Sequence, residues 1–168
     1  MAFANQVVWI TGASSGIGEA LAYAFSQAGA TLVLSARRIT ELERVRAHCA
    51  NAYRHLLMPL DLADFDADAH TQQVIDQLGR IDILVNSGGI SQRGAVHETA
   101  LTVDRRIMEI NFFGTIALTK AVLPTMLARK QGQLVVISSV QGKVSKACLL
   151  YTSTGCAARN GAAQPDDG

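Results

Sequence analysis

The first residues whose types and spacing could support chemistry form a glycine-rich loop, Thr11 to Gly18, which directly follows an apolar run and opens an amphipathic stretch. A glycine turn between a buried strand and a helix start leaves unpaired backbone N–H groups where a pyrophosphate can bind. The spacing is Gly-x3-Gly-x-Gly, which differs from the common Gly-x-Gly-x2-Gly dinucleotide motif. We predict nucleotide binding here, with a plain strand-to-helix turn as the alternative. The loop residues expected to line the nucleotide are Gly12, Ser14, Ser15, Gly16, Ile17 and Gly18.

A pair of arginines follows the second apolar run, in the segment Ser35-Ala36-Arg37-Arg38. Proteins that bind NAD usually place an acidic residue near this point, where it holds the 2′-hydroxyl of the adenosine ribose. Arg37 and Arg38 instead offer guanidinium groups that match a 2′-phosphate in charge and geometry. The sequence therefore favours NADP over NAD. The alternative is a solvated charge pair at the start of a helix.

The elements that must position these residues alternate between apolar runs and amphipathic stretches. This alternation predicts an α/β fold of the Rossmann type, a doubly wound parallel sheet with helices on both faces. The expected strands are Gln6–Thr11, Thr31–Ser35, Arg54–Leu60, Ile81–Asn86 and Gln133–Ser138. The expected helices are Gly16–Ala28, Thr40–Asn51, Asp64–Leu78 and an interrupted Leu101–Lys130.

Two prolines test this predicted arrangement of strands and helices. Pro59 lies in the third expected strand, and proline is tolerated in strands mainly at a sheet edge. The doubly wound strand order 3-2-1-4-5 places this strand at an edge. Pro124 lies late in the last expected helix, and we expect it to kink or end that helix.

Composition limits the possible partners. The formal net charge is +1, from 15 basic and 14 acidic residues, so nothing favours nucleic acid or an anionic membrane. We find no apolar stretch that approaches the length of a membrane span and expect no membrane partner. Cys49, Cys148 and Cys156 lack metal-site spacing, so we expect no metal, reduced thiols and a cytoplasmic protein.

Further motifs, in order along the chain, resemble those of the classical short-chain dehydrogenase/reductase (SDR) family. They are the Thr11–Gly18 loop, Asp61-Leu62, Asn86-Ser87-Gly88-Gly89, Asn111 and Ser138-Ser139, and the resemblance covers residues 3 to 146. The resemblance implies an oxidoreductase that transfers hydride between NADP(H) and a small carbonyl or alcohol substrate. It also implies a homo-oligomer for the full-length protein. The substrate itself is not implied.

The resemblance also implies roles for individual residues. Asp61 would bond the adenine amino group and Leu62 would cover the ring, while Asn86 and Gly88 would let the cofactor lie against a strand end. The family more often has Asn-Asn-Ala-Gly where this chain has Asn86-Ser87-Gly88-Gly89. Asn111 would hold a helix distortion and a relay water, and Ser139 would hydrogen-bond the substrate carbonyl oxygen. A helix-entry acid and a structural amide remain the alternatives for Asp61 and Asn111.

The family's Tyr-x3-Lys signature is absent. In that signature a lysine lowers the pKa of a tyrosine, ordinarily about 10, so that the tyrosine can transfer a proton near neutral pH. Tyr151 is the only tyrosine within reach, but it lies one residue short of the expected distance from Ser139, and Gly155 stands where the lysine should be. We expect an inactive chain. The alternative is a non-catalytic dinucleotide-binding module.

The chain changes character near its end. Residues 154 to 168 are rich in Ala and Gly and show no helix or strand period. We expect an NAD(P)-binding Rossmann domain at 1–147 and a disordered or non-native tail at 148–168. On this hypothesis the chain is a C-terminally truncated, incomplete SDR without the later strands. The apolar run Leu134 to Ile137 would then form an exposed, aggregation-prone sheet edge.

Overall fold

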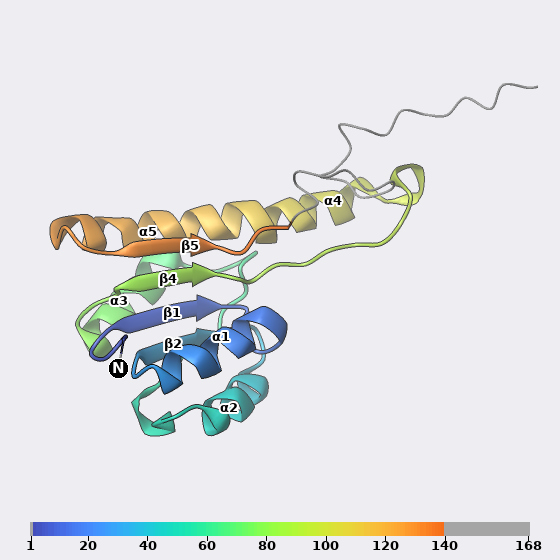
Figure 1. The fold of residues 1–168 in the computed structure, drawn as a ribbon. Helices are drawn as coiled ribbons and strands as arrows, with labels where there is room; N and C mark the ends of the chain where they lie inside the picture. The colour runs from blue at the N-terminus through green and yellow to red at the C-terminus, as the bar shows by residue number, and fades with distance from the viewer. Residues whose placement is uncertain (1, 140–168) are drawn as a thin grey trace, which may run out of the picture.

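The computed structural model describes residues 2–139 and shows a parallel sheet with the order β3-β2-β1-β4-β5 (Figure 1). The strands are β1 (Val7–Thr11), β2 (Thr31–Ser35), β3 (Leu56–Leu57), β4 (Ile83–Asn86) and β5 (Gln133–Val136). The α-helices are α1 (Gly16–Gln27), α2 (Ile39–His48), α3 (Ala67–Leu78), α4 (Leu101–Met108) and α5 (Thr115–Ala128). The predicted Rossmann-type fold and strand order are confirmed.

The sheet separates two hydrophobic cores. Successive side chains of a strand point to opposite faces, so Val7 and Trp9 of β1 enter one core while Val8 and Ile10 enter the other. The first core also takes residues of α3 and α5, and the second takes residues of α1 and α2. Every residue of β1 is buried, which explains why its sequence is apolar without alternation.

Strand β3 is shorter than the predicted Arg54–Leu60, because Arg54 ends a 3-10 turn and only two residues form the ladder. The backbone N–H of Met58 still donates to Leu34 of β2 at 2.9 Å, and that of Leu60 donates to Ala36, just beyond β2, at 3.2 Å. The nitrogen of Pro59 between them therefore faces the open edge, where a missing N–H costs no ladder bond. The edge position predicted from this proline is correct.

The last long helix is interrupted by a change of helix type. A π-helical segment, Glu109–Gly114, joins α4 to α5. Pro124 lies inside α5, which continues to Ala128, so the expectation that the helix could end at this proline is wrong. Because π-helical turns contain an extra residue, side chains beyond the segment are rotated relative to those before it. Asn111 lies within the segment.

By length and composition alone, the continuous helix Leu101–Ala128 could cross a membrane. This corrects the expectation that no apolar stretch reaches such a length. In the structure the helix lies beside α3 on one face of the sheet (Figure 1), where Leu118, Val122 and Met126 are buried in the first core. Its apolar composition is thus explained in part by packing within the domain.

Strand β5 forms the other edge of the sheet. It pairs with β4 on one side, and within residues 2–139 no strand pairs with its other side. All four of its residues are exposed, including three apolar ones. The expected apolar edge is therefore present in the described part of the chain.

Candidate functional site

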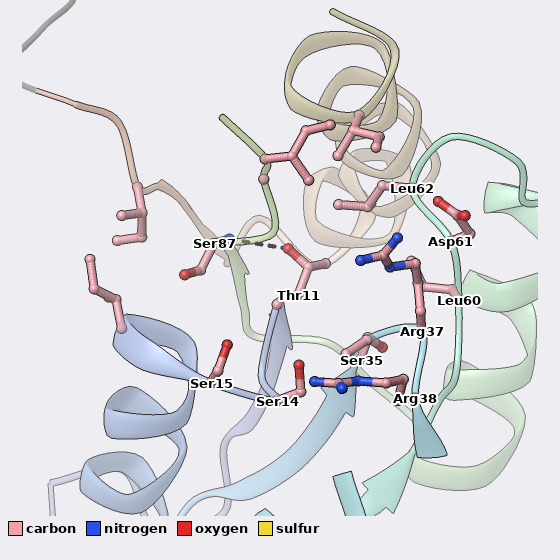
Figure 2. Close-up of a pocket in the computed structure, with 17 residues that line it drawn as sticks. Thr11, Ser14, Ser15, Ser35, Arg37, Arg38, Leu60, Asp61, Leu62 and Ser87 are labelled. Atoms are coloured by element: carbon pink, nitrogen blue, oxygen red, sulfur yellow. Dashed lines mark hydrogen bonds between the residues drawn. The ribbon is translucent and has the colours of Figure 1, made fainter. Parts of the chain in front are cut away.

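A cavity of about 340 Å³ opens at the carboxyl ends of the strands (Figure 2). It lies where β2 and β4 flank β1, the point at which the strand order reverses and at which doubly wound sheets bind ligands. Predicted site residues that line it are Gly12, Ser14, Ser15, Ile17, Arg37, Arg38, Asp61 and Leu62. The structure thus brings together residues from three separate loops.

The floor of the cavity is a close contact between the loops after β1 and β4. The hydroxyl oxygen of Thr11 accepts a hydrogen bond from the backbone N–H of Ser87 at 3.1 Å (Figure 2). It accepts a second from the backbone N–H of Gly88 at 3.0 Å. Gly12 has φ +66°, and a Cβ there would lie 2.8 Å from the Gly88 backbone. Only glycine fits at position 12 without moving the second loop.

Helix α1 begins at the cavity with its first N–H groups pointing out of the helix. These groups have no partner inside any α-helix. Ser15 occupies the N-cap position, yet its side chain makes no capping hydrogen bond. Gly16, the first helical residue, has φ +58°. The helix start is therefore able to donate hydrogen bonds to an anion.

Arg37 and Arg38 supply positive charge on the β2 side of the cavity. Both are exposed, and their guanidinium groups point into the space shown in Figure 2, with Arg38 directed toward Ser14. Neither forms an ion pair with any residue of the described part of the chain. Ala36 stands beside them, so this loop has no acidic side chain to bond a ribose hydroxyl.

Asp61 and Leu62 form the far wall. One carboxylate oxygen of Asp61 accepts from the backbone N–H of Ala63 at 3.0 Å, and the other accepts from Arg106 at 3.1 Å. Asp61 thus faces the cavity and bonds the backbone of the turn that follows it. The alternative role of helix-entry acid is wrong for Asp61, because Asp66 is the N-cap of α3 and accepts from the backbone N–H of Ala69 at 2.9 Å. Leu62 is buried, and its side chain packs against the backbone of Gly88.

Other predicted residues lie around the cavity and do not line it. They are Gly16, Gly18, Asn86, Gly88, Asn111 and Ser139. The buried Asn86 side chain donates to the Thr119 hydroxyl of α5 at 3.2 Å. Asn111 exchanges two hydrogen bonds of 2.8 Å with the backbone of Ile90, so the amide joins the helix to the loop after β4.

The predicted catalytic residues are only partly within the described chain. Ser139 is exposed and lies just beyond β5, two residues after Ile137, which lines the cavity. Tyr151 and the predicted tail at 148–168 lie outside the described residues. Among residues 2–139 there is no group of three acidic, histidine or cysteine side chains that could hold a metal ion.

Sequence reasoning did not predict several of the lining residues, among them Thr11, Ser35, Leu60, Ser87, Gly89, Ile90, Ile110 and Ile137. The partners of the Thr11 hydroxyl, Ser87 and Gly88, lie 76 and 77 residues further along the chain, so the local sequence does not reveal this contact. Ser35 accepts a hydrogen bond from the buried Trp9 indole at 2.8 Å. Its partner lies on a neighbouring strand, which the local sequence does not reveal.

Comparisons with known proteins agree with this geometry. A family model described as short chain dehydrogenase matches residues 6–162. Dehydrogenase/reductase SDR family member 7 of Homo sapiens is 52% identical over 147 residues, which are 84% of this chain and 43% of that protein. The 7-like SDR family protein of Anopheles gambiae is 55% identical over 146 residues, 83% of this chain and 46% of that protein. The chain spans less than half the length of these relatives.

Solved structures share the fold. A metagenomic short-chain oxidoreductase in complex with NADP is similar with a TM-score of 0.83 and 32% sequence identity. The match covers 89% of this chain and 69% of the metagenomic protein.

Proposed function

The chain belongs to the short-chain dehydrogenase family, and on that premise we propose that its cavity binds NADP(H) in preference to NAD(H). The observation that carries the proposal is the pair Arg37 and Arg38, two guanidinium groups without an ion-pair partner among residues 2–139. A 2′-phosphate at this loop would meet both charges. NAD offers only a hydroxyl there, and Ala36 cannot accept its hydrogen bond.

The remaining parts of the cavity fit a dinucleotide. The uncapped start of α1 can donate to a diphosphate, and Gly12 and Gly88 bring the loops after β1 and β4 together without side chains of their own. Leu62 offers an apolar surface to the adenine ring, and Asp61 accepts from donors at the same wall. When bound, the nicotinamide supplies the site from which hydride leaves or to which it is added.

For the reaction we propose transfer between the cofactor and a carbonyl or alcohol carbon of a small molecule, with Ser139 and Asn111 as contributors. The Ser139 hydroxyl would donate to the substrate carbonyl oxygen, where negative charge develops during reduction. Asn111 would hold the loop after β4 beside the substrate through its bonds to Ile90. We also propose a cytoplasmic location and a homo-oligomer for the full-length protein.

The cofactor proposal is tested by titrating the 168-residue chain with NADPH and with NADH and following nucleotide fluorescence. In the double variant Arg37→Ala, Arg38→Ala we expect at least about tenfold weaker NADPH binding and unchanged NADH binding, because two charge-assisted contacts are lost. Arg54→Ala removes another exposed arginine and serves as the control. Equal losses for both nucleotides would contradict the NADP preference.

A second candidate, a non-catalytic dinucleotide-binding module, is favoured by one observation: no Tyr-x3-Lys occurs in the sequence. Both candidates predict stabilisation by NADPH. Only the oxidoreductase predicts that the chain oxidises NADPH when a carbonyl compound is added. A panel of aldehydes and ketones tests this: oxidation of NADPH would exclude the binding module, whereas stabilisation without turnover would favour the binding module or a truncated oxidoreductase.

A further inference from the structure

Arg44 of α2 lies outside the lining of the cavity but contacts the loop that forms it. Its Nη2 donates to the backbone carbonyl of Ser14 at 3.1 Å. The same guanidinium forms a bidentate pair with Glu19 of α1, at 2.7 and 3.0 Å. One side chain thus joins helix α2, which follows the Arg37–Arg38 loop, to both the glycine-rich loop and the helix that the loop opens.

Glu19 makes this contact important for an anionic ligand. It lies in the first turn of α1, close to the N–H groups that would meet a diphosphate. Hydrogen bonds from Arg44 and from Tyr23 lower the pKa of Glu19 to about 2, so the carboxylate is ionised at neutral pH. An uncompensated carboxylate at this point would oppose a bound phosphate.

We propose that Arg44 is a positioning residue of the dinucleotide site, which fixes the Ser14 carbonyl and neutralises Glu19 so that the start of α1 can accept a diphosphate. The bidentate pair places positive charge on the Glu19 carboxylate, and the contact with Ser14 orients the loop backbone. Nε of Arg44 also donates to Glu41 of α2 at 3.0 Å, which holds the guanidinium in place from its own helix. This inference rests on the proposed function, because it requires that the cavity hold a dinucleotide.

The role of Arg44 differs from that proposed for Arg37 and Arg38. The diphosphate is common to NADPH and NADH, whereas the 2′-phosphate belongs to NADPH alone. Loss of Arg44 should therefore weaken the binding of NADPH and of NADH by the same factor and leave the ratio of the two affinities unchanged. This expectation separates the two sets of arginines in one titration series.

The test uses the 168-residue chain and fluorescence titrations with NADPH and NADH. For Arg44→Met we expect about fivefold weaker binding of both nucleotides, because a charge near a helix end typically changes the free energy by about 1 kcal/mol. Arg44→Lys keeps the charge but loses the fork, so its effect should be smaller. Arg46→Met, on the same helix, is the matched control and should bind both nucleotides like the unaltered chain.

A second variant that removes the Glu19 charge adds a readout that a purely structural role would not change. In the Arg44→Met background, Glu19→Gln removes the uncompensated carboxylate and should recover part of the lost affinity. Because Arg44 and Glu19 are partly exposed, the effect of Arg44→Met should also shrink at high salt. Circular dichroism establishes that each variant is folded; if Arg44→Met is not, Arg44→Lys and the double variant carry the comparison.

The outcomes separate the two proposals. If the unaltered chain binds neither nucleotide, both the proposed function and the role of Arg44 fail. If the unaltered chain binds but the folded Arg44 variants bind equally well, only the role of Arg44 fails. A loss confined to NADPH would also overturn it, because Arg44 would then act on the 2′-phosphate.

Discussion

The buried side chain of His55 can make both of its hydrogen bonds only when the imidazole is neutral. Its Nδ1 accepts a hydrogen bond from the backbone N–H of Leu32 at 3.2 Å, so Nε2 carries the proton and donates to the Ala50 carbonyl at 2.9 Å. If Nδ1 also carried a proton, its N–H would face the backbone N–H of Leu32, and neither donor would have an acceptor there. Burial lowers the pKa of His55.

This geometry predicts a pH-dependent free energy of unfolding. The pKa of His55 is lower in the folded chain than its value of about 6.5 in the unfolded chain, so the unfolded state takes up the proton first as the pH falls. The stabilisation is complete above pH 6.5 and declines below it, by up to about 1.4 kcal/mol per pH unit. Urea unfolding at a series of pH values measures the decline.

The variant His55→Gln should lose this dependence near pH 6, while His70→Gln, which alters a partly exposed histidine of α3, should retain it. The lowered pKa of Glu19 and of Asp82 affects stability only at more acidic pH. An unchanged pH profile in His55→Gln would contradict the assignment.

At the scale of elements, Asp82, which directly precedes β4, ties this strand to β1 and to the end of α5. It lies at the end of the sheet opposite the cavity. Its buried carboxylate accepts from the backbone N–H of Val7 at the start of β1 and from Arg129 just beyond α5, at 2.8 and 2.9 Å. Arg80 adds a further pair at 2.8 Å. Burial alone would raise the pKa of Asp82, but these hydrogen bonds outweigh it and lower the pKa.

We expect Asp82→Asn to reduce the free energy of unfolding by about 2–3 kcal/mol, because it leaves two guanidinium groups without their shared carboxylate. Arg80→Gln removes only the more exposed partner and should cost less. Chemical denaturation measures both changes. NADPH affinity of the folded variants should stay constant, since the cavity lies at the other end of the strands.

The elements were predictable where local sequence decides them. Apolar runs located β1, β2, β4 and β5, and Pro59 identified an edge because proline lacks the N–H that an inner ladder needs. The site was predictable where motifs are contiguous, as in the loop after β1. Other contacts join residues that are distant in sequence. Arg44 and Glu19 are 25 positions apart, and Thr11 is 76 or 77 positions from its partners in the loop after β4. Such partners become neighbours only after folding.

At the scale of the whole molecule, the described domain leaves one apolar sheet edge open. Parallel sheets normally bury both faces, yet Val136 of β5 is 58% exposed and the strand carries no charged residue. An edge strand with unpaired N–H and C=O groups is a template for pairing with another copy. The formal net charge of +1 gives little repulsion to oppose it.

We therefore expect concentration-dependent self-association of the 168-residue chain through β5, measured by light scattering after size-exclusion chromatography. Val136→Lys places a charge on the edge and should reduce association. Leu127→Lys is the matched control, because Leu127 is 65% exposed but lies on α5, away from unpaired strand groups. A monodisperse monomer would contradict the expected self-association. Equal reduction of association by both lysines would show that strand pairing at β5 is not the cause of association. Selective relief by Val136→Lys would mean that backbone pairing, and not exposed apolar surface in general, drives the assembly.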